Sequence, residues 1–228
     1  MTIMKNLFYI SLLALGLFEV ANVYFIMPMP GSQQMDSLAL AYFLYSYRWW
    51  FRVGLVLLGL ISIPGALKTS RKWVPLLAMV PVLAVVVLFN FKMTADHMFL
   101  QPSALLLENL AGNSLPDSTV VLVVEQDGHA KAYPLRYIIY HHQVRDSIGN
   151  RSAMITYCSV CRTGRAFEPV VNGAPEVFRL VGMDHFNAMF EDARTRSWWR
   201  QATGEAVAGP SSGTTLHELH SWQMTVGQ

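Results

Sequence analysis

Three long apolar stretches in the N-terminal part of the chain constrain its fold more than any other feature. They cover residues 7–26, 49–67 and 73–91, and each has about the 20 apolar residues that a helix needs to cross a bilayer. Soluble domains carry about 25% charged residues, whereas this chain carries 14%. The sequence therefore predicts a three-helix transmembrane anchor within residues 1–91.

The flanks of these stretches have the residues that end membrane helices. The run Pro28-Met29-Pro30-Gly31 follows the first stretch and cannot continue a helix. Trp49, Trp50 and Trp73 stand at predicted helix ends, where indole rings favour the membrane interface. The first stretch is too long for a signal peptide and no small-residue cleavage pattern follows it, so we expect a retained helix.

The connection between the second and third stretches indicates the orientation. Its sequence, Lys68-Thr69-Ser70-Arg71-Lys72, is the densest group of cations near the membrane, and such loops stay in the cytoplasm. Three crossings then place the C-terminal domain outside the cytoplasmic membrane. Arg48, Arg52 and Lys92 fall on the outer side in this arrangement, which weakens the charge asymmetry.

Two further features of the anchor leave alternatives open. Glu19 lies about halfway along the first stretch, and an acid there is expensive unless it is neutralised. It is expected to be protonated, to pair with Arg52, or to meet a partner subunit; a role in proton movement is the less favoured interpretation. Residues 38–47 are predicted to form an interfacial helix or an extension of the second span.

The remainder of the chain has the composition of a globular domain, with a linker at residues 92–118 and a domain at 119–228. Two hairpin signals, Gln126-Asp127-Gly128 and Asn172-Gly173, separate β-branched and apolar runs. One stretch with helical spacing covers residues 135–144. The pattern predicts an α+β, mainly β, extracytoplasmic domain, with strands at 119–125, 129–133, 152–157, 165–171, 176–180, 188–191 and 205–207.

The charge of the chain excludes one class of partner. The formal net charge is +2, and no stripe of Lys and Arg is present, so nucleic-acid binding is not expected. The predicted partners are the lipid bilayer and other subunits of a membrane complex.

The two cysteines, Cys158 and Cys161, form a single CxxC motif. A thioredoxin-like site needs this motif at the start of a helix, and Gly164 followed by a strand-like run gives no sign of one. A zinc ribbon needs a second CxxC, which the chain lacks. Three interpretations remain: a mixed metal site, a redox pair and a structural pair.

The metal interpretation needs further ligands, and the sequence offers several. His141 and His142 end the predicted helix, but neighbouring helical residues point about 100° apart, so only one is expected to face the cysteines. Met183 and His185 lie in a later turn. Thiolates, imidazole and a thioether are ligands that suit copper(I) and accept zinc.

A second polar group lies at Glu191-Asp192-Ala193-Arg194-Thr195-Arg196-Ser197-Trp198-Trp199-Arg200-Gln201. Its carboxylates, guanidiniums and indoles are compatible with a pocket. The favoured interpretation is a surface hairpin with cross-strand ion pairs.

Several motifs in order resemble the family catalogued as domain of unknown function 3179. They are Ala132-Tyr133-Pro134-Leu135-Arg136 followed by His141, Ile155-Thr156-Tyr157-Cys158-Ser159-Val160-Cys161-Arg162-Thr163-Gly164, Thr195-Arg196-Ser197-Trp198-Trp199-Arg200-Gln201 and Thr203-Gly204-Glu205-Ala206-Val207-Ala208-Gly209-Pro210. The resemblance covers residues 120–228 and implies a Cys/His site in which His141 is the family histidine. His142 stands where many members carry an acid, and the turn at residues 182–187 looks like a membrane-anchored branch. No established activity follows from it.

These observations predict a membrane-anchored protein with a metal site formed by Cys158, Cys161 and His141, completed by His185 or Met183, with copper favoured over zinc. Its predicted role is copper handling, or that of an accessory subunit in a membrane complex. The alternatives are a thiol–disulfide oxidoreductase that uses the same cysteines without metal, and a purely structural subunit. A catalytic residue is not assigned.

Overall fold

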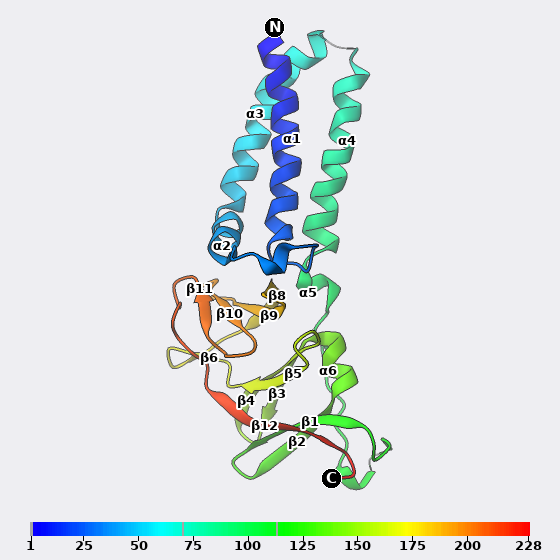
Figure 1. The fold of residues 1–228 in the computed structure, drawn as a ribbon, viewed down its shortest axis with the longest axis vertical. Coiled ribbons are helices and arrows are strands. Elements are labelled where there is room, and N and C mark those ends of the chain that lie inside the picture. Colours follow the sequence, from blue (N-terminus) through cyan, green and yellow to red (C-terminus); the bar gives the residue numbers. More distant parts are fainter. Residues whose placement is uncertain (1, 70, 113) are drawn as a thin grey trace. The chain divides into compact units, whose positions relative to one another are not determined.

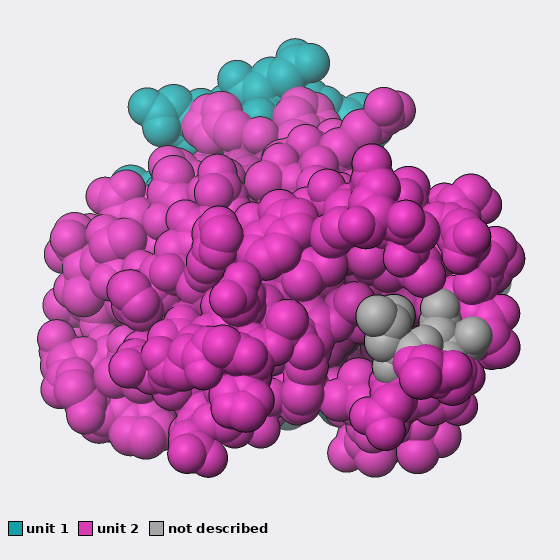
Figure 2. Space-filling model, turned by 90° about the horizontal axis from the view of Figure 1, so that it is seen from below, with its two compact units in different colours: residues 1–98 teal, residues 99–228 magenta. Residues whose placement is uncertain are grey.

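The computed structural model describes residues 2–69, 71–112 and 114–228. The chain divides into two compact units (Figure 1), the first Met1–Met98 and the second Phe99–Gln228. Figure 2 shows the surface of the second unit in magenta.

The first unit is helical, and three of its segments are long and apolar enough to cross a membrane. These segments are Thr2–Tyr24, Arg48–Lys68 and Trp73–Lys92, so the three predicted spans are confirmed as candidates by length and composition. The helical elements are α1 (Thr2–Tyr24), the 3-10 turn η1 (Ser32–Gln34), α2 (Leu38–Ser46), α3 (Arg48–Thr69), α4 (Trp73–Val87), the π-helical turn η2 (Leu88–Lys92) and α5 (Ala95–Met98).

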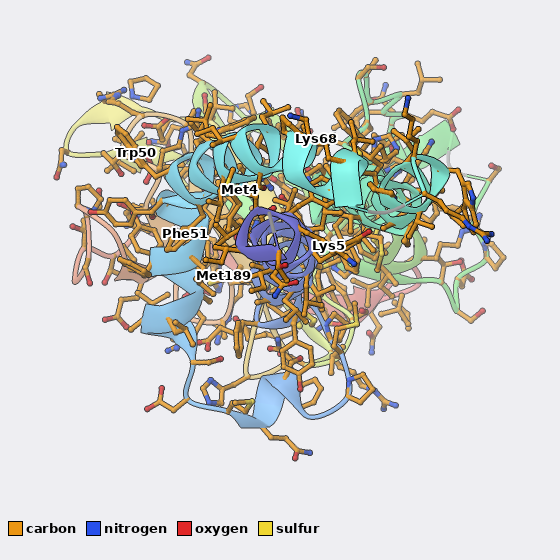
Figure 3. All side chains as sticks on the ribbon, turned by 90° about the horizontal axis from the view of Figure 1, so that it is seen from above. Met4, Lys5, Trp50, Phe51, Lys68 and Met189 are labelled. Carbon is orange, nitrogen blue, oxygen red and sulfur yellow. The ribbon has the colours of Figure 1, made fainter. Side chains whose placement is uncertain are left out.

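Small residues let α1 and α3 approach closely. A Cβ atom added to Gly65 would lie 2.4 Å from the Cβ of Met4, so a larger residue would separate the helices. A Cβ at Gly59 would lie 3.2 Å from the hydroxyl of Ser11. Figure 3, seen from above, labels Met4 on α1 and Lys68 on α3. Small residues of this kind are typical of helix contacts in membranes, where close packing replaces hydrophobic burial.

The acid in the first span is paired. Arg52 donates from Nε to Glu19 Oε1 at 2.7 Å and from Nη2 to Oε2 at 2.9 Å. Asn90 of η2 donates to Glu19 Oε2 at 2.9 Å and accepts a hydrogen bond from Arg52. We call Glu19, Arg52 and Asn90 the polar triad. It joins three helical segments, and of the three alternatives for Glu19 the structure has the pairing with Arg52. Glu19 lies in the second half of α1, Arg52 near the start of α3, and Asn90 near the end of the third span, so the polar triad lies toward one end of the three spans and not midway along them.

The connection between the first two spans is folded. Helix α1 ends at Tyr24, and Ser32 and Gln33 donate hydrogen bonds to the carbonyl of Met27, near that end. Residues 38–46 form a separate helix, α2, and only Tyr47 separates it from α3.

The second unit is mainly β. Its larger sheet has six strands in the order β2-β1-β12-β5-β4-β3, with every neighbouring pair antiparallel. The strands are β1 (Val120–Gln126), β2 (His129–Pro134), β3 (Gln143–Ile148), β4 (Arg151–Cys158), β5 (Thr163–Phe167) and β12 (Glu218–Thr225). Side chains bridge the two edge strands: Lys131 of β2 lies 3.0 Å from Asp146 of β3, and Tyr133 donates to Asp146 at 2.7 Å. The sheet is therefore nearly a closed barrel.

Helix α6 (Leu135–His141) packs on the core of this sheet. Ile138 is fully buried with Val124, Val144 and Ile155. The helix was expected to continue to residue 144, but it ends where His142 takes the left-handed conformation, with φ 58°. Gln143 then begins β3, a strand that the sequence pattern did not predict.

A second sheet has the strand order β11-β10-β9-β8. Gln201, directly after β10, links this sheet to β4 and β5: its side-chain amide donates to Thr156 Oγ1 and to the Thr163 carbonyl, both at 3.1 Å. The strands of the second sheet are β8 (Phe178–Asp184), β9 (Asn187–Asp192), β10 (Trp198–Arg200) and β11 (Ala206–Ala208); β6 (Val170–Val171) and β7 (Ala174–Pro175) form a separate hairpin, and η3 (Leu110–Gly112) precedes β1. Leu105, in the predicted linker, packs against the core of the domain.

Candidate functional site

The CxxC motif occupies the hairpin loop between β4 and β5. Cys158 pairs with Thr163 in the strand register, so the loop has four residues, of which Arg162 is left-handed with φ 53°. The loop turns both cysteine side chains the same way, and the two sulfurs lie 2.8 Å apart. A disulfide bond measures about 2.05 Å, so both thiols are free.

The two thiols differ in exposure. Cys158 is at the end of β4 and is fully buried, whereas Cys161 is exposed. Only one sulfur of the pair is therefore accessible to another molecule. The backbone N–H of Cys161 also donates to the Cys158 sulfur at 3.3 Å, which holds the loop over the buried thiol.

The turn between β8 and β9 contacts both sulfurs. Asp184 pairs with Asn187, which leaves His185 and Phe186 as a two-residue turn. The carbonyl oxygen of Phe186 lies 3.4 Å from the Cys158 sulfur and 3.3 Å from the Cys161 sulfur. We call this pair, His185 and Phe186, the cysteine-facing turn.

The cysteine-facing turn has an unfavourable backbone. His185 has φ 48° and Phe186 has φ 63°, the combination that favours Asn-Gly in a two-residue hairpin. Non-glycine residues in such conformations cost on the order of 1–3 kcal/mol each and concentrate at functional sites. The strain therefore supports a functional role for this turn.

Asn187 supplies a polar hydrogen to the exposed sulfur. Its Nδ2 donates to Cys161 Sγ at 3.2 Å, and its Oδ1 accepts from the backbone N–H of Ala202 at 3.0 Å. The second contact fixes the amide so that the nitrogen faces the sulfur. Sequence reasoning did not single out Asn187 as a site residue; its position directly after a turn between two strands was the available signal.

The electrostatics of the pair favour the thiol form. Partial burial and the neighbouring Cys158 thiol raise the pKa of Cys161, while the hydrogen bond from Asn187 lowers it. The helix N-terminus that activates thioredoxin-type cysteines is not next to this motif, because Cys161 lies in a β-hairpin loop. The sequence-based exclusion of a thioredoxin-like helix is confirmed.

The histidines make other contacts. His141 Nδ1 bonds the Leu100 carbonyl, and His142 Nδ1 bonds the Tyr157 carbonyl at 2.9 Å. His142 is buried, and this burial lowers its pKa. His185 Nδ1 lies 2.8 Å from Asp184 Oδ1.

The predicted metal ligands are only partly brought together. The sulfurs of Cys158 and Cys161 lie side by side. His185 precedes Phe186, whose carbonyl oxygen contacts both sulfurs. Met183 lies on β8, opposite Ala188. Within residues 2–69, 71–112 and 114–228, no group of three or more His, Cys, Asp or Glu side chains is arranged to hold a metal ion. The copper or zinc site stays a prediction.

The second polar group forms ion pairs, as the favoured interpretation predicted, but its acids and indoles are buried, so the prediction of a surface hairpin is wrong. Glu191 is buried, pairs in register with Arg179, and lies 2.8 Å from the Arg179 guanidinium and 3.1 Å from that of Arg196. Trp198 and Trp199 are fully buried. Their indole N–H groups donate to Glu191 at 3.3 Å and to Asp192 at 2.8 Å, respectively, so these indoles belong to the core and do not line a pocket.

The comparisons with known proteins agree with the resemblance seen in the sequence. No curated protein and no solved structure matches the chain. The profile described as "Protein of unknown function (DUF3179)" matches residues 106–228. This match spans the CxxC hairpin, the cysteine-facing turn and both sheets, and it covers more than half of the sequence, so the chain belongs to the DUF3179 family.

Proposed function

We propose that residues 99–228 form a thiol–disulfide redox domain, carried outside the cytoplasm by the membrane anchor. The observation that supports this most directly is the cysteine pair itself, with two free sulfurs 2.8 Å apart, one exposed and one buried. A dithiol that cycles needs one accessible sulfur to attack and a second within reach to resolve the intermediate.

The exposed cysteine is assigned the attacking role. The Cys161 thiolate attacks one sulfur of a partner's disulfide, that S–S bond breaks, and the partner keeps one thiolate while a mixed disulfide forms. The thiolate that the partner keeps takes the proton of Cys158, and the Cys158 sulfur then attacks the Cys161 sulfur. The bond from Cys161 to the partner breaks, so the partner gains two electrons and the pair becomes a disulfide.

The surroundings of the pair suit slow, selective exchange. Because the pKa of Cys161 is raised, only a small fraction is thiolate at neutral pH. Asn187 donates to the Cys161 sulfur at 3.2 Å and would stabilise the thiolate as it forms. A partner that adds a further hydrogen-bond donor beside this sulfur would increase the reactive fraction.

The anchor supports an oxidising location. The cationic loop at residues 68–72 favours a cytoplasmic position, and three spans then leave the C-terminal unit outside. Disulfides persist in such compartments, so a free dithiol there needs either a cycle of reduction or a ligand that holds it.

The test is equilibration of the full-length protein, in detergent, with redox buffers set between about −120 and −320 mV, a range that includes known dithiol oxidoreductases and the glutathione pool. We expect one reversible two-electron transition, measured by alkylation and mass spectrometry. Cys158→Ser is expected to accumulate a mixed disulfide through Cys161, whereas Cys161→Ser is not.

The matched pair of variants separates the two roles. If neither cysteine enters a disulfide across this range, or if both variants trap the partner equally, the redox assignment is wrong. Ser159→Ala, in the same loop but without a thiol, serves as the control and is expected to behave as the parent protein.

Metal handling is the second candidate, favoured by the convergence of both sulfurs beside the turn that carries His185. The predicted soft ligand set suits copper(I) before zinc. Elemental analysis of the protein purified with and without added copper tests it: about one equivalent of metal, lost in both cysteine variants, would support it. Service as a subunit of a membrane complex is compatible with either chemistry.

A further inference from the structure

A crevice separate from the cysteines lies between the two sheets of the second unit. Its volume is about 170 Å³, and its walls include Gln143 and Arg145 of β3, Met154 of β4, and Glu176 and Phe178 next to and in β8. A cavity of about 150 Å³ holds a benzene molecule. The crevice therefore has room for a small organic molecule.

One wall presents a hydrogen-bond acceptor that lacks a donor. The side chain of Glu176 is 5% exposed, and its Oε1 accepts from the backbone N–H of Val177 at 2.8 Å. Its Oε2 is buried and forms an ion pair with Arg194, whose Nε lies 3.5 Å away, but it accepts no hydrogen bond. A buried carboxylate oxygen in this state is destabilising unless a donor reaches it.

The opposite wall is rich in hydrogen-bond donors. The carbonyl oxygen of Phe178 faces three side-chain donors: Gln101 at 3.4 Å, Gln143 at 3.3 Å, and Arg145. Gln101 also donates to the side-chain oxygen of Gln143. A guanidinium has five N–H donors, and the Phe178 carbonyl accepts from only one nitrogen of Arg145, so Arg145 has N–H groups that can serve another acceptor.

Arg145 is the charged member of this donor wall. Among the residues described, no carboxylate lies within salt-bridge distance of it, and partial burial lowers the pKa of its guanidinium. Asp146 also lines the crevice, but Lys131 at 3.0 Å and the hydroxyl of Tyr133 at 2.7 Å already occupy its carboxylate. A guanidinium without a carboxylate partner is suited to bind an anionic group.

We propose that this crevice binds a small zwitterion. Its ammonium group donates to Glu176 Oε2, and its carboxylate or phosphate accepts from Arg145 and Gln143. Met154 and Phe178 supply the apolar surface for a short carbon chain between the two charges. Two sources share this chemistry: a free α-amino acid, and the headgroup of an ethanolamine phospholipid. The site includes neither cysteine, so it extends beyond the proposed redox function.

The test measures binding of defined probes to the full-length protein by calorimetry. Glycine and phosphoethanolamine carry both charges, whereas acetate and methylammonium carry one each. We expect each zwitterion to bind at least about 10-fold more tightly than either single-charge probe, because both walls contribute. Glu176→Gln and Arg145→Met should each weaken zwitterion binding by about 10- to 100-fold, the effect of losing one charged hydrogen bond.

Controls address charge and folding. Glu205→Gln and Arg151→Met change exposed charges outside the crevice and are expected to leave binding unchanged. The variant with both cysteines replaced by serine should also bind as the parent does, so a failure of the redox proposal would not affect this result.

Three outcomes would overturn the proposal. The first is that acetate or methylammonium binds as tightly as glycine, and the second is that Glu176→Gln and Arg145→Met leave zwitterion binding unchanged. The third is that no probe binds with a Kd of about 10 mM or below, since weaker binding would not indicate a specific site. A further arm assigns the source. Tight binding of phosphoethanolamine with stabilisation in bilayer discs that contain ethanolamine lipid indicates the headgroup, and tight binding of glycine alone indicates a free amino acid; both support the zwitterion.

Discussion

The polar triad makes a prediction whose magnitude can be worked out from the contacts. Glu19 is 1% exposed and accepts two hydrogen bonds from Arg52, at 2.7 and 2.9 Å, and one from Asn90. Removing one partner of a buried ion pair leaves an uncompensated charge and costs about 3–5 kcal/mol, whereas replacing both by apolar residues is often neutral or stabilising. A charge inside a membrane helix adds about 2.5–3.5 kcal/mol on insertion scales.

We therefore expect Arg52→Leu and Glu19→Leu each to lower the free energy of unfolding by about 3 kcal/mol. The double variant should lose less than either single variant, which gives a coupling energy of at least about 3 kcal/mol in a double-mutant cycle. The assay is unfolding of the full-length protein in mixed micelles, with an increasing fraction of denaturing detergent, followed by tryptophan fluorescence.

Arg48→Leu is the matched control. Arg48 also lies at the start of α3, but it donates to the carbonyl of Tyr45 and lies over the ring of that residue instead of pairing with an acid. Its removal is expected to change stability by less than about 1 kcal/mol. Additive effects of the two leucine variants, or single losses no larger than the control, would refute the idea that the triad holds the three helices together.

Three further predictions concern the topology and the second unit. A reporter fused after Lys92 should be extracytoplasmic and one at Thr69 cytoplasmic; the opposite pattern would reverse the assignment of the compartment. Burial lowers the pKa of His142, so the folded state favours the neutral imidazole. The stability that this neutral imidazole contributes is present above the pKa of an unfolded histidine and is lost as the pH falls toward the lower folded-state pKa. His142→Asn should reduce the loss of thermal stability between about pH 7.5 and 5, which calorimetry can measure, while the same change at His141 serves as the control. Because the pKa of Cys161 is raised, its alkylation rate should keep increasing with pH beyond the ordinary thiol range of about 8.5, and a plateau below that value would contradict the assigned surroundings.

The parts of the fold that follow local rules were predictable. The hairpin at Asp127-Gly128 formed as expected because both residues take positive φ, at 51° and 76°. The apolar spans, the strand at 152–157 and the one-sided arrangement of the two sulfurs likewise follow from length, alternation and two-residue spacing.

Other parts depended on tertiary context. Strand β12 is central in the six-stranded sheet, between β1 and β5, yet Glu218–Thr225 mixes polar and apolar residues without clear alternation. Its pairing with two distant strands, not its own pattern, decides its conformation. The predicted helix at residues 135–144 includes the first two residues of strand β3, because the apolar residues before them have helical spacing, and residues 145–148 have no predicted element. The break at His142 appears only in its backbone angle.

The cysteine-facing turn shows why the site was the hardest part to anticipate. The sequence signal for a two-residue hairpin turn is Asn or Gly, because these residues tolerate a positive φ. His185 and Phe186 are neither Asn nor Gly, although both have a positive φ. Residues held in a backbone conformation that their side chain disfavours are expected at functional sites, since the surrounding structure must hold the strain. Here the strained backbone aims the Phe186 carbonyl at both sulfurs and brings Asn187 to the exposed one.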